Sequence, residues 1–366
     1  MRDFSKLRFV EIGAPWLKTV FPQQTLCFST FHTRRTADPD NGLYNISLAT
    51  LPKLHRALRA PDLSLIACRP LFYPPWHWQW INRELFSRRA LRGESRLSSA
   101  LGTQLLRLPV RAPIAVLDTE DYPAINPDRF FLLSRCRLYF KRELPPDRWR
   151  LFMGTAHPNL PSRRFRQQSR YRDAIAKIRP LPLGLPLDSR GLLPVAAQDK
   201  TVDVFFVGDT EHSSTVRAAG IRELTALRDQ GVTLDIPQAR LTLPEFYQRA
   251  ARAWLVWSPE GLGWDCFRHY EALACGAVPV INQPTIERHW PLAAGQHAFY
   301  YDPTPGELPR TIVAALADKE RLRAMARAGQ AHVMAHHTPD ALARYVVETT
   351  LGNENPDQQP DQQPLV

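Results

Sequence analysis

Residues 258–280 have the sequence SPEGLGWDCFRHYEALACGAVPV, which carries the clearest structural signal in the chain. It follows the apolar run Trp254–Trp257 with a loop rich in proline and glycine, then continues into a helical pattern over Arg268–Cys275. A second apolar run, Val278–Ile281, comes directly after it. A strand, a helix and a further strand in this order predict a parallel βαβ unit. The loop and the start of the helix would then lie at the carboxyl end of the first strand, where α/β proteins bind ligands.

The same alternation continues on both sides of this stretch. The predicted strands are Val202–Val207, Leu234–Ile236, Trp254–Trp257 and Val278–Ile281, and the predicted helices are Arg217–Gln230, Leu243–Ala253, Arg268–Cys275, Pro309–Leu316 and Lys319–Ala335. Strands that alternate with helices predict a doubly wound α/β sheet over residues 201–350.

The first half of the chain has weaker signals of the same kind. Its predicted strands are Thr25–Phe31, Leu63–Cys68, Ile114–Asp118 and Arg137–Phe140, and its predicted helices are Leu51–Leu58 and Arg83–Leu91. Short apolar runs with long connections between them are typical of buried parallel strands joined by crossovers.

The length of the chain and one proline-rich segment indicate two domains. A chain of 366 residues is too long for a single hydrophobic core. Residues 179–187, RPLPLGLPL, interrupt both helix and strand. We therefore expect an α/β protein with two Rossmann-like doubly wound domains, over residues 1–180 and 201–350, joined by a linker over 181–200. Residues 351–366 are polar and proline-rich, which predicts a disordered tail.

Charge is distributed unequally between the two halves. The whole chain has 47 Lys and Arg and 36 Asp and Glu, a net charge of +11, but residues 1–200 carry +17 and residues 201–366 carry −6. A compositional bias explains why 40 of the basic residues are Arg, but it does not explain the opposite signs. The basic half favours an anionic partner, such as an anionic glycan, a lipid-linked acceptor or a membrane surface.

Cysteine usage and hydropathy indicate a cytoplasmic protein. The five cysteines are scattered and form no CxxC pair, so neither a disulfide framework nor a structural zinc site is expected. The N-terminus lacks a continuous apolar segment of signal-peptide length, and no run of about 18 apolar residues is long enough to span a bilayer.

The start of the helix in residues 258–280 predicts an anion site. Gly261 and Gly263 would let the backbone approach a ligand closely, and Asp265 is placed as an N-cap. Arg268 and Glu271 lie three residues apart, on one face of the helix. Arg268 suits a phosphate and Glu271 suits the hydroxyls of a sugar or ribose, whereas the alternative is a surface Arg–Glu pair.

The order and residue types of this segment resemble the nucleotide-sugar site of GT-B glycosyltransferases, including the group 1, exostosin-like and spore-coat-protein-like branches. The matching pieces are Glu260–Gly263, Glu271–Gly276 and Pro279–Val280. The resemblance implies that the helix N-terminus and Arg268 hold the diphosphate and that Glu271 binds the ribose. Many retaining members have two acidic residues eight positions apart. Gly263 occupies the position eight before Glu271, so the resemblance does not establish retaining chemistry.

Further donor contacts are expected from the loop after the first strand of the second domain. Gly208 and Asp209 begin this loop and Arg217 follows in the next helix, so each is a candidate for a second phosphate contact. A solvent-exposed arginine is the alternative for Arg217. Trp264 would stack on a base or sugar ring, unless it is part of the core.

The first domain is expected to supply the catalytic groups and the acceptor site. Asp118, Glu120 and Asp121 follow a predicted strand, and crowded carboxylates raise one another's pKa, which suits a general base. The alternative is a capping and turn cluster. His32 is a second candidate base, and residues 141–143, KRE, would suit an anionic acceptor or the departing diphosphate.

Two aromatic or basic stretches bear on partners. Trp76, Trp78 and Trp80 alternate beside several arginines and would share one face of a strand, which suits a membrane interface or a carbohydrate, with the core as the alternative. Residues 163–172, RRFRQQSRYR, are basic, but no base-reading module surrounds them, so no nucleic acid partner is expected.

These features together predict a cytoplasmic GT-B glycosyltransferase of the hexosyltransferase type, at the inner face of the membrane or free of it, in polysaccharide or cell-envelope biosynthesis. Its donor would be a nucleoside diphosphate sugar bound between the two lobes, with no metal ion and no cofactor. A sugar-nucleotide epimerase or hydrolase of the same fold is one alternative. A non-catalytic protein that binds membranes or nucleic acid through its basic half is the other.

Overall fold

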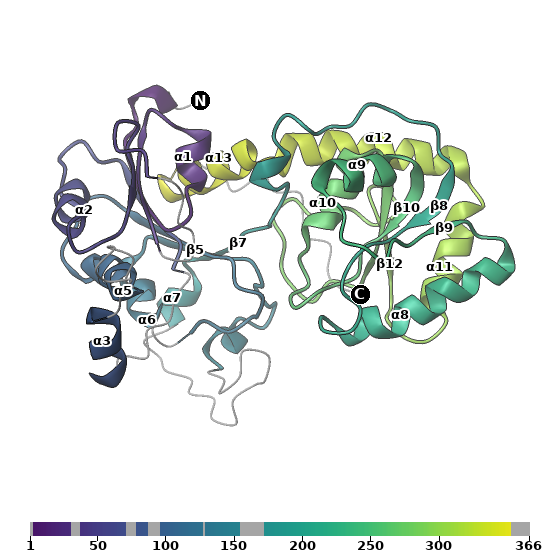
Figure 1. Cartoon of the computed structure of the whole chain (residues 1–366), viewed down its shortest axis with the longest axis horizontal. Coiled ribbons are helices and arrows are strands. Elements are labelled where there is room, and N and C mark those ends of the chain that lie inside the picture. Colours follow the sequence, from purple (N-terminus) through teal and green to yellow (C-terminus); the bar gives the residue numbers. More distant parts are fainter. Residues whose placement is uncertain are drawn as a thin grey trace. The chain divides into compact units, whose positions relative to one another are not determined.

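The structure is a computed structural model that describes residues 3–30, 37–70, 78–86, 96–126, 129–153 and 172–352. The chain forms two compact units. The first comprises Met1–Leu181 and Ala343–Val366, and the second comprises Pro182–Leu342. Each unit has its own parallel sheet with helices on both faces (Figure 1), so the prediction of two doubly wound α/β domains is confirmed.

The first unit is built on a seven-stranded sheet in the order β3-β2-β1-β4-β5-β6-β7, and every neighbouring pair is parallel. The strands are β1 (Phe9–Ile12), β2 (Thr25–Ser29), β3 (Leu43–Asn45), β4 (Leu65–Cys68), β5 (Ile114–Asp118), β6 (Leu138–Lys141) and β7 (Ile178–Pro180). Strands β1, β4, β5 and β6 are buried at every position. Burial on both faces explains why these segments are almost uniformly apolar in the sequence.

Helices and short 3-10 turns cover both faces of the first sheet. They are η1 (Phe4–Lys6), α1 (Trp16–Val20), α2 (Leu51–Leu58), α3 (Trp78–Leu85), α5 (Arg96–Gln104), η3 (Leu105–Arg107), α6 (Phe130–Arg135), η5 (Arg148–Phe152), α7 (Arg172–Ile175) and α13 (Pro339–Thr350). One face packs against α2 and α6 through Leu54, Leu58 and Leu132. The other face packs against α1 and α13.

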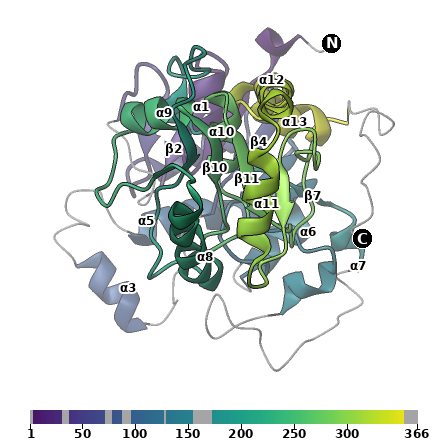
Figure 2. The same ribbon diagram turned by 90° about the vertical axis from the view of Figure 1, so that its right-hand side faces the viewer.

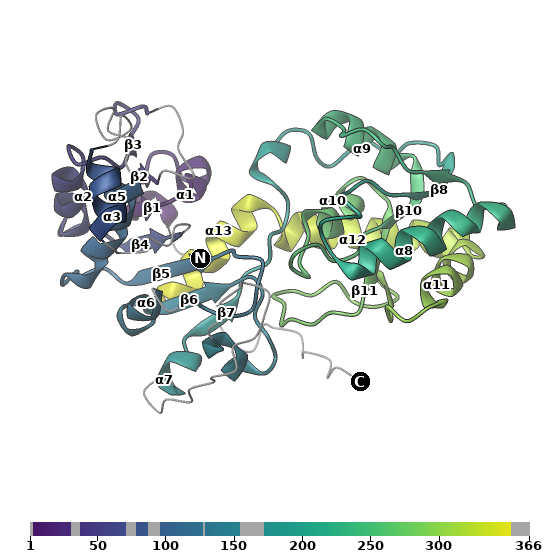
Figure 3. The same ribbon diagram turned by 60° about the horizontal axis from the view of Figure 1, so that its bottom comes forward.

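The last helix returns to the first unit. In α13 the side chains of Tyr345, Val346 and Val347 are buried against the first sheet, and the Tyr345 ring meets the Phe140 ring of β6 edge-on at 5.5 Å. Figure 3 shows α13, in yellow, alongside β5 and β6. The boundary expected at residue 350 is therefore displaced to Ala343, because the apolar face of α13 completes the core of the first unit.

The second unit has a five-stranded parallel sheet in the order β12-β11-β10-β8-β9. The strands are β8 (Val202–Phe205), β9 (Leu234–Asp235), β10 (Ala253–Trp257), β11 (Val278–Asn282) and β12 (Phe299–Tyr301). The helical segments are η7 (Leu187–Ser189), α8 (Thr215–Ala226), η8 (Leu227–Gln230), α9 (Leu243–Ala251), α10 (Phe267–Ala274), α11 (Glu307–Leu316) and α12 (Lys319–His336).

The helices of the second unit divide between the two faces of its sheet. Leu255 and Trp257 of β10 pack with α8 and α11, whereas Val256 between them packs with α9 and α10. This alternation follows from the two-residue period of a strand. Figure 2 turns this unit toward the viewer and shows α8 and α11 side by side. Helix α12 contributes Leu322 to one face and Val333 to the other.

The segment expected to be a linker packs into the second unit. Leu185 is 4% exposed in a cluster with Tyr270 and Leu273 of α10. The backbone N–H of Leu183 donates a 2.6 Å hydrogen bond to Asp265 Oδ2. Residues 182–200 therefore form part of the second unit, because their apolar side chains are buried on α10 and its surroundings.

Most elements of the second sheet were predictable, whereas several of the first were not. The sequence analysis did not identify β1, β3, β7, β12 or α13. The alternating tryptophans do not lie on a strand, because Trp78 and Trp80 are in helix α3. Trp76, the run 163–172 and most of the predicted tail lie outside the described residues.

We expect Val346→Ala to destabilise the first unit by about 2 kcal/mol, since it removes two buried methyl groups from the contact between α13 and the sheet. Urea unfolding monitored by circular dichroism would measure this change. Glu348→Ala on the same helix is the control and should alter the unfolding free energy by less than about 0.5 kcal/mol. An unchanged midpoint for Val346→Ala would show that α13 is not integral to the unit.

Candidate functional site

The polar side chains of the second unit gather at the carboxyl ends of β8, β10 and β11. These strands are adjacent and parallel, so the loops that follow β8 and β10 lie next to each other. Each loop leads directly into a helix, α8 or α10. The arrangement therefore presents two helix N-termini at one edge of the sheet, the edge where α/β proteins bind ligands.

Arg217 lies in the first turn of α8 and is held from several sides. Ser214 is the N-cap, and its Oγ accepts a 3.2 Å hydrogen bond from the Arg217 N–H and donates one of 3.1 Å to the Glu260 carbonyl. The Arg217 side chain is 8% exposed. Its guanidinium donates long bonds of 3.4 Å to the carbonyls of Asp209 and Pro259. Ser214 thus ties the two loops together and positions Arg217 between them.

Arg268 lies in the first turn of α10 and extends toward the same loops. Its Nη2 donates a 2.6 Å bond to the Val207 carbonyl, and its guanidinium lies over the Phe206 ring at 5.3 Å. Burial, and then the nearby charge of Arg217, lower the pKa of Arg268 to about 10. The side chain is still protonated at neutral pH, so it remains a hydrogen-bond donor and a positive charge.

Two glycines allow the arginines to converge. A methyl group at Gly208 would lie 2.9 Å from Arg268 Nη2 and 3.4 Å from Arg217 Nη1, and one at Gly261 would lie 2.9 Å from Arg217 Nη2. Any larger residue would displace the guanidinium groups. Gly263 serves a different purpose, since its carbonyl accepts from the Gly261 N–H at 2.9 Å and closes the loop into a tight turn.

Both arginines retain buried N–H groups without a partner. Arg217 Nε and Arg268 Nη1 are buried, and neither makes a hydrogen bond to any described residue. Two adjacent positive charges with unused donors are costly unless an anion completes them. Arg217, Arg268 and the start of α10 are called the anion site below.

The start of α10 contributes to the anion site without a side-chain cap. Cys266, not Asp265, is the N-cap residue, and no side-chain hydrogen bond caps the helix there. The expected capping role of Asp265 is therefore wrong. Its carboxylate is buried and accepts from the Tyr270 hydroxyl and the Leu183 N–H instead. Within the described part of the chain, the side chain at the N-cap position therefore does not occupy the first N–H groups of α10.

Trp264 belongs to the core, which excludes the predicted stacking on a ligand. It is 4% exposed, and its Nε1 donates to the carbonyls of Asn282 and Gln283 at 3.1 and 3.0 Å. Its own carbonyl is 2.9 Å from His269 Nε2, while His269 Nδ1 lies 2.7 Å from Ser258 Oγ. Burial lowers the pKa of His269 to about 3, so a neutral ring links both ends of the loop.

The two glutamates of the motif have different surroundings. Glu260 Oε2 accepts a 3.0 Å bond from the Asn282 side-chain amide, whose oxygen accepts from the Glu260 N–H at 2.8 Å. Glu271 is 6% exposed, and its Oε1 accepts a 2.9 Å bond from the Tyr247 hydroxyl. Burial raises the pKa of both carboxyl groups. Neither glutamate forms a simple surface pair with Arg268, which was the alternative considered for Glu271.

The structure thus brings four of the ten predicted donor residues together at one place. Gly208, Arg217, Gly261 and Arg268 meet at the anion site, whereas the carboxylate of Asp209 accepts from the N–H groups of its own turn. Sequence reasoning missed Ser214, Cys266, His269 and Asn282. Ser214 carries a recognisable signal, a serine three residues before Arg217 at the start of a helix.

At the carboxyl edge of the first sheet, Asp118 is not the base that the sequence suggested. It is 1% exposed, and it accepts a 2.6 Å bond from the Tyr139 hydroxyl while pairing with Lys141 and Arg129, each at 3.2 Å. Although burial alone would raise the pKa of Asp118, the charges of Lys141 and Arg129 hold it below the ordinary value. The expected raising by neighbouring carboxylates is therefore wrong, because cations surround this residue.

The other two acidic residues of this cluster are more accessible. Glu120 pairs with Arg129 at 2.8 Å and Asp121 pairs with Arg142, and the Asp121 side chain is 46% exposed. Glu11 at the end of β1 has a pKa raised by burial to about 7, but its oxygens accept from three backbone N–H groups of α1. His32 lies outside the described residues.

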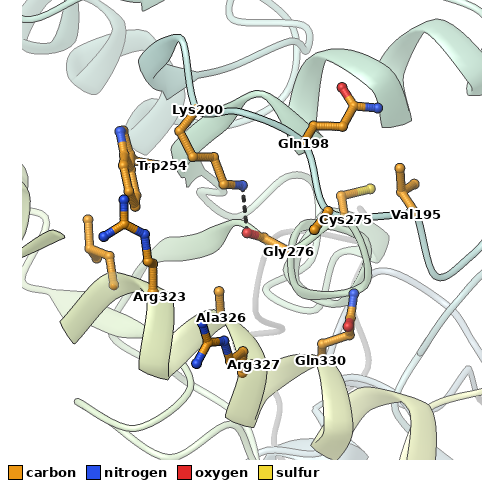
Figure 4. A pocket seen from close by; sticks show the side chains of 12 residues that line it. Val195, Gln198, Lys200, Trp254, Cys275, Gly276, Arg323, Ala326, Arg327 and Gln330 are labelled. Carbon is orange, nitrogen blue, oxygen red and sulfur yellow. Dashed lines mark hydrogen bonds between the residues drawn. The ribbon is translucent and has the colours of Figure 1, made fainter. Parts of the chain in front are cut away.

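A separate open pocket of about 280 Å³ lies at the opposite, amino edge of the second sheet. In Figure 4, Lys200 points into it between Trp254, Arg323 and Gly276. Lys200 Nζ donates to the carbonyls of Ala251 and Gly276 at 2.8 and 2.6 Å, where α9 and α10 end, and burial lowers its pKa to about 8. These two bonds hold the partly buried Lys200 ammonium group between the ends of α9 and α10.

A histidine cluster packs around the loop after β11. His332 and His337 each place Nε2 within 3.0 Å of the Trp290 carbonyl, and the Trp290 ring stacks on His336 at 4.1 Å. Burial lowers the pKa of His289 to about 3 and that of His297 to about 4. The pKa values of His332, His336 and His337 are lowered for the same reason.

Two further properties concern the described residues only. No three His, Cys, Asp or Glu side chains among them are grouped so that they could hold a metal ion. Among the helices of the described segments, none is both long enough and apolar enough to cross a bilayer.

Part of the chain matches a known family model, and nearly the whole chain is similar in fold to solved structures. Residues 236–348 match the model of the family described as "Glycosyl transferase-like". An alpha-glucosyltransferase in complex with UDP and a 13-mer DNA has a TM-score of 0.54 at 10% identity, covering 94% of this chain and 99% of that one. A glycosyltransferase from Rickettsia africae has a TM-score of 0.50 at 11% identity, covering 95% and 91%. No curated protein matches the sequence.

We expect the second unit to lose stability as the pH falls from about 6.5 to 4. Unfolded histidines bind a proton near pH 6.5, whereas His269 and His289 stay neutral to about pH 3 when folded. The unfolded chain therefore binds more protons in this range, and each such histidine lowers the unfolding free energy by up to about 1.4 kcal/mol per pH unit. Urea unfolding at several pH values, with histidine titration by NMR, would measure this. A flat profile would contradict it.

Proposed function

We propose that this chain transfers a sugar from a nucleoside diphosphate sugar to an acceptor hydroxyl, because residues 236–348 match the glycosyl transferase-like family model and the chain has the GT-B fold. The proposal rests on one observation above all. Arg217 and Arg268 converge at the anion site with buried N–H groups that no described residue satisfies. A diphosphate carries the charge and the acceptor oxygens that such a pair requires.

The donor would bind with its diphosphate at the anion site. Arg217 and Arg268 would each donate to a phosphate oxygen, and the uncapped N–H groups of α10 would add to them. Glu271 lies one turn further along α10, where the oxygen that Tyr247 does not use is suited to a ribose hydroxyl. UDP is the first nucleotide to test, because the alpha-glucosyltransferase with the same fold was solved with UDP.

Departure of the diphosphate is the step that the anion site would promote. As the bond to the sugar breaks, negative charge increases on the leaving phosphate. Two fixed guanidinium groups and a helix N-terminus stabilise that charge without reorganising during the reaction. We therefore propose that this positive charge performs the role that a metal ion has in other transferases, and that the transfer needs no cofactor.

The acceptor side is assigned to the first unit. Asp121 is the most exposed carboxylate of the cluster after β5, and Glu120 lies beside it. Their exposure supports a role for either in taking the proton of an acceptor hydroxyl, whereas Asp118 is neutralised by Lys141 and Arg129. Of the three, Asp121 is the proposed general base.

The charge of the first half favours an anionic acceptor, such as an acidic glycan or a lipid-linked sugar, for polysaccharide or cell-envelope synthesis. Trp78 and Phe86, at the two ends of α3, have 71% and 83% of their surface exposed. Large exposed aromatic side chains beside basic residues are typical of proteins that associate with a membrane surface from the cytoplasm. Peripheral association through α3 is therefore part of the proposal.

Arg217→Ala and Arg268→Ala should each weaken UDP binding by about 2–3 kcal/mol, roughly 30- to 150-fold, because each removes a buried charged donor. Isothermal titration calorimetry would measure the dissociation constants. Arg323→Ala changes an exposed arginine at the opposite edge of the same sheet and should leave the affinity within about twofold. Equal affinity in all four proteins would contradict the donor site.

Asp121→Asn should lower kcat by about 10²- to 10⁴-fold while UDP affinity stays unchanged, since it removes a proton acceptor and no donor contact. The exposed Asp62→Asn serves as the control. Turnover is measured as UDP release with and without acceptor, because release without acceptor would instead indicate a hydrolase. A normal kcat for Asp121→Asn would exclude this residue as the base.

A further inference from the structure

Cys266 differs from the other cysteines of the chain. Cys27, Cys68, Cys136 and Cys275 are buried, and burial raises the pKa of each of these thiols. Cys266 is only partly buried. Reagents that attack thiols act on the accessible thiolate form. Cys275 lines the open pocket at the amino edge of the second sheet but is only 3% exposed, so Cys266 is the most accessible of the five thiols.

The position of Cys266 places its sulfur beside the anion site. It is the N-cap residue of α10, with an extended backbone (φ −131°, ψ 141°). Its Sγ lies 3.8 Å from Arg217 Nη2 and 3.8 Å from the point where a Cβ on Gly261 would be. The sulfur is therefore in contact with the guanidinium that the proposed diphosphate would use.

Two neighbours of Cys266 would stabilise a thiolate, and its Sγ also lies 3.8 Å from the Pro259 carbonyl, which accepts from the protonated thiol. A helix N-terminus and a nearby arginine both stabilise a thiolate. Arg217 is 8% exposed and its Nε has no partner among the described residues, which independently indicates that this site receives an anion. Oxygen atoms added to the sulfur would bring a negative charge next to the Arg217 guanidinium, whose Nη2 lies 3.8 Å from Sγ.

We propose that Cys266 is a modification site that controls nucleotide binding: peroxide or a thiol reagent that modifies its sulfur blocks the anion site. This inference rests on the proposed function, since the blocked ligand is the diphosphate of the donor. The observation that carries the inference is the contact between Cys266 Sγ and Arg217 Nη2.

The chemistry balances with hydrogen peroxide as the oxidant. The Cys266 thiolate attacks one oxygen of the peroxide, an S–O bond forms and the O–O bond breaks, and after proton transfer the products are a sulfenic acid and water. The sulfur is oxidised by two electrons and the peroxide is reduced. A second peroxide converts the sulfenic acid to a sulfinate, whose negative charge would pair with Arg217 and occupy the phosphate position.

Nucleotide and modification should therefore exclude each other. A diphosphate bound to Arg217 would cover Cys266, and a modified Cys266 would take the place of the diphosphate. There is little space for a diphosphate and a modified sulfur together, because the backbone at Gly261 passes close to Arg217 Nη2 and to Cys266 Sγ. The effect differs from general oxidative damage, since the buried thiols are not exposed to the oxidant.

The test combines alkylation, oxidation and UDP binding on the full chain. Native protein treated briefly with N-ethylmaleimide should carry one label, on Cys266, as shown by peptide mass spectrometry. Saturating UDP should slow this labelling at least tenfold. Arg217→Gln should slow labelling several-fold in the absence of UDP, because it removes the charge next to the sulfur.

Peroxide treatment should raise the UDP dissociation constant of the wild-type protein at least tenfold. The same treatment should not change the UDP dissociation constant of Cys266→Ser. Serine is also a good N-cap residue, so the helix is preserved. Labelling at a buried cysteine at an equal rate, or an equal peroxide effect in Cys266→Ser, would overturn the inference. Failure of untreated wild-type protein to bind UDP would instead overturn the proposed function, because labelling and its dependence on Arg217 are measured without nucleotide.

Discussion

The central constraint on the second unit is the placement of two positive charges side by side, with no ion pair from either to an acidic side chain of the described residues. Arg217 and Arg268 come from different helices, and their charges repel each other, which contributes to the lowered pKa of Arg268. Backbone carbonyls of the loops after β8 and β10 accept their hydrogen bonds, and Gly208 and Gly261 leave the space they need. Under the proposed function, binding of a diphosphate would recover the free energy that this arrangement costs, and the two guanidinium groups would already be in position.

The remaining polar residues of the second unit keep these loops in place. His269, neutral because it is buried, connects Ser258 with the Trp264 carbonyl across the loop after β10. Asn282 at the end of β11 holds Glu260, and Asp265 joins α10 to Leu183. None of these side chains needs to contact the ligand. Their part is to fix the backbone, so that the arginines and the first turn of α10 keep their relative positions.

In the first unit, the charged residues at the carboxyl end of β5 stabilise the fold. Asp118 follows its strand as a donor-site residue would, yet Lys141, Arg129 and the Tyr139 hydroxyl surround it. A buried carboxylate needs such partners, because an unpaired charge in the interior is costly. The two carboxylates differ in exposure. The Asp121 side chain is partly exposed to solvent, which is why it is proposed as the base, whereas Asp118 is buried.

The sequence by itself determined the two α/β units, most of the second sheet and the motif that carries Arg268, because strand and helix periodicity and glycine-rich loops are local properties. It could not determine that Asp265 and Trp264 are buried, that Cys266 occupies the N-cap position of α10, or that α13 completes the first unit. Those facts depend on contacts between segments far apart in the chain, such as Asp265 with Leu183 and Tyr345 with Phe140. Only the tertiary structure decides which polar groups find partners, and therefore which arginine N–H groups remain for a ligand.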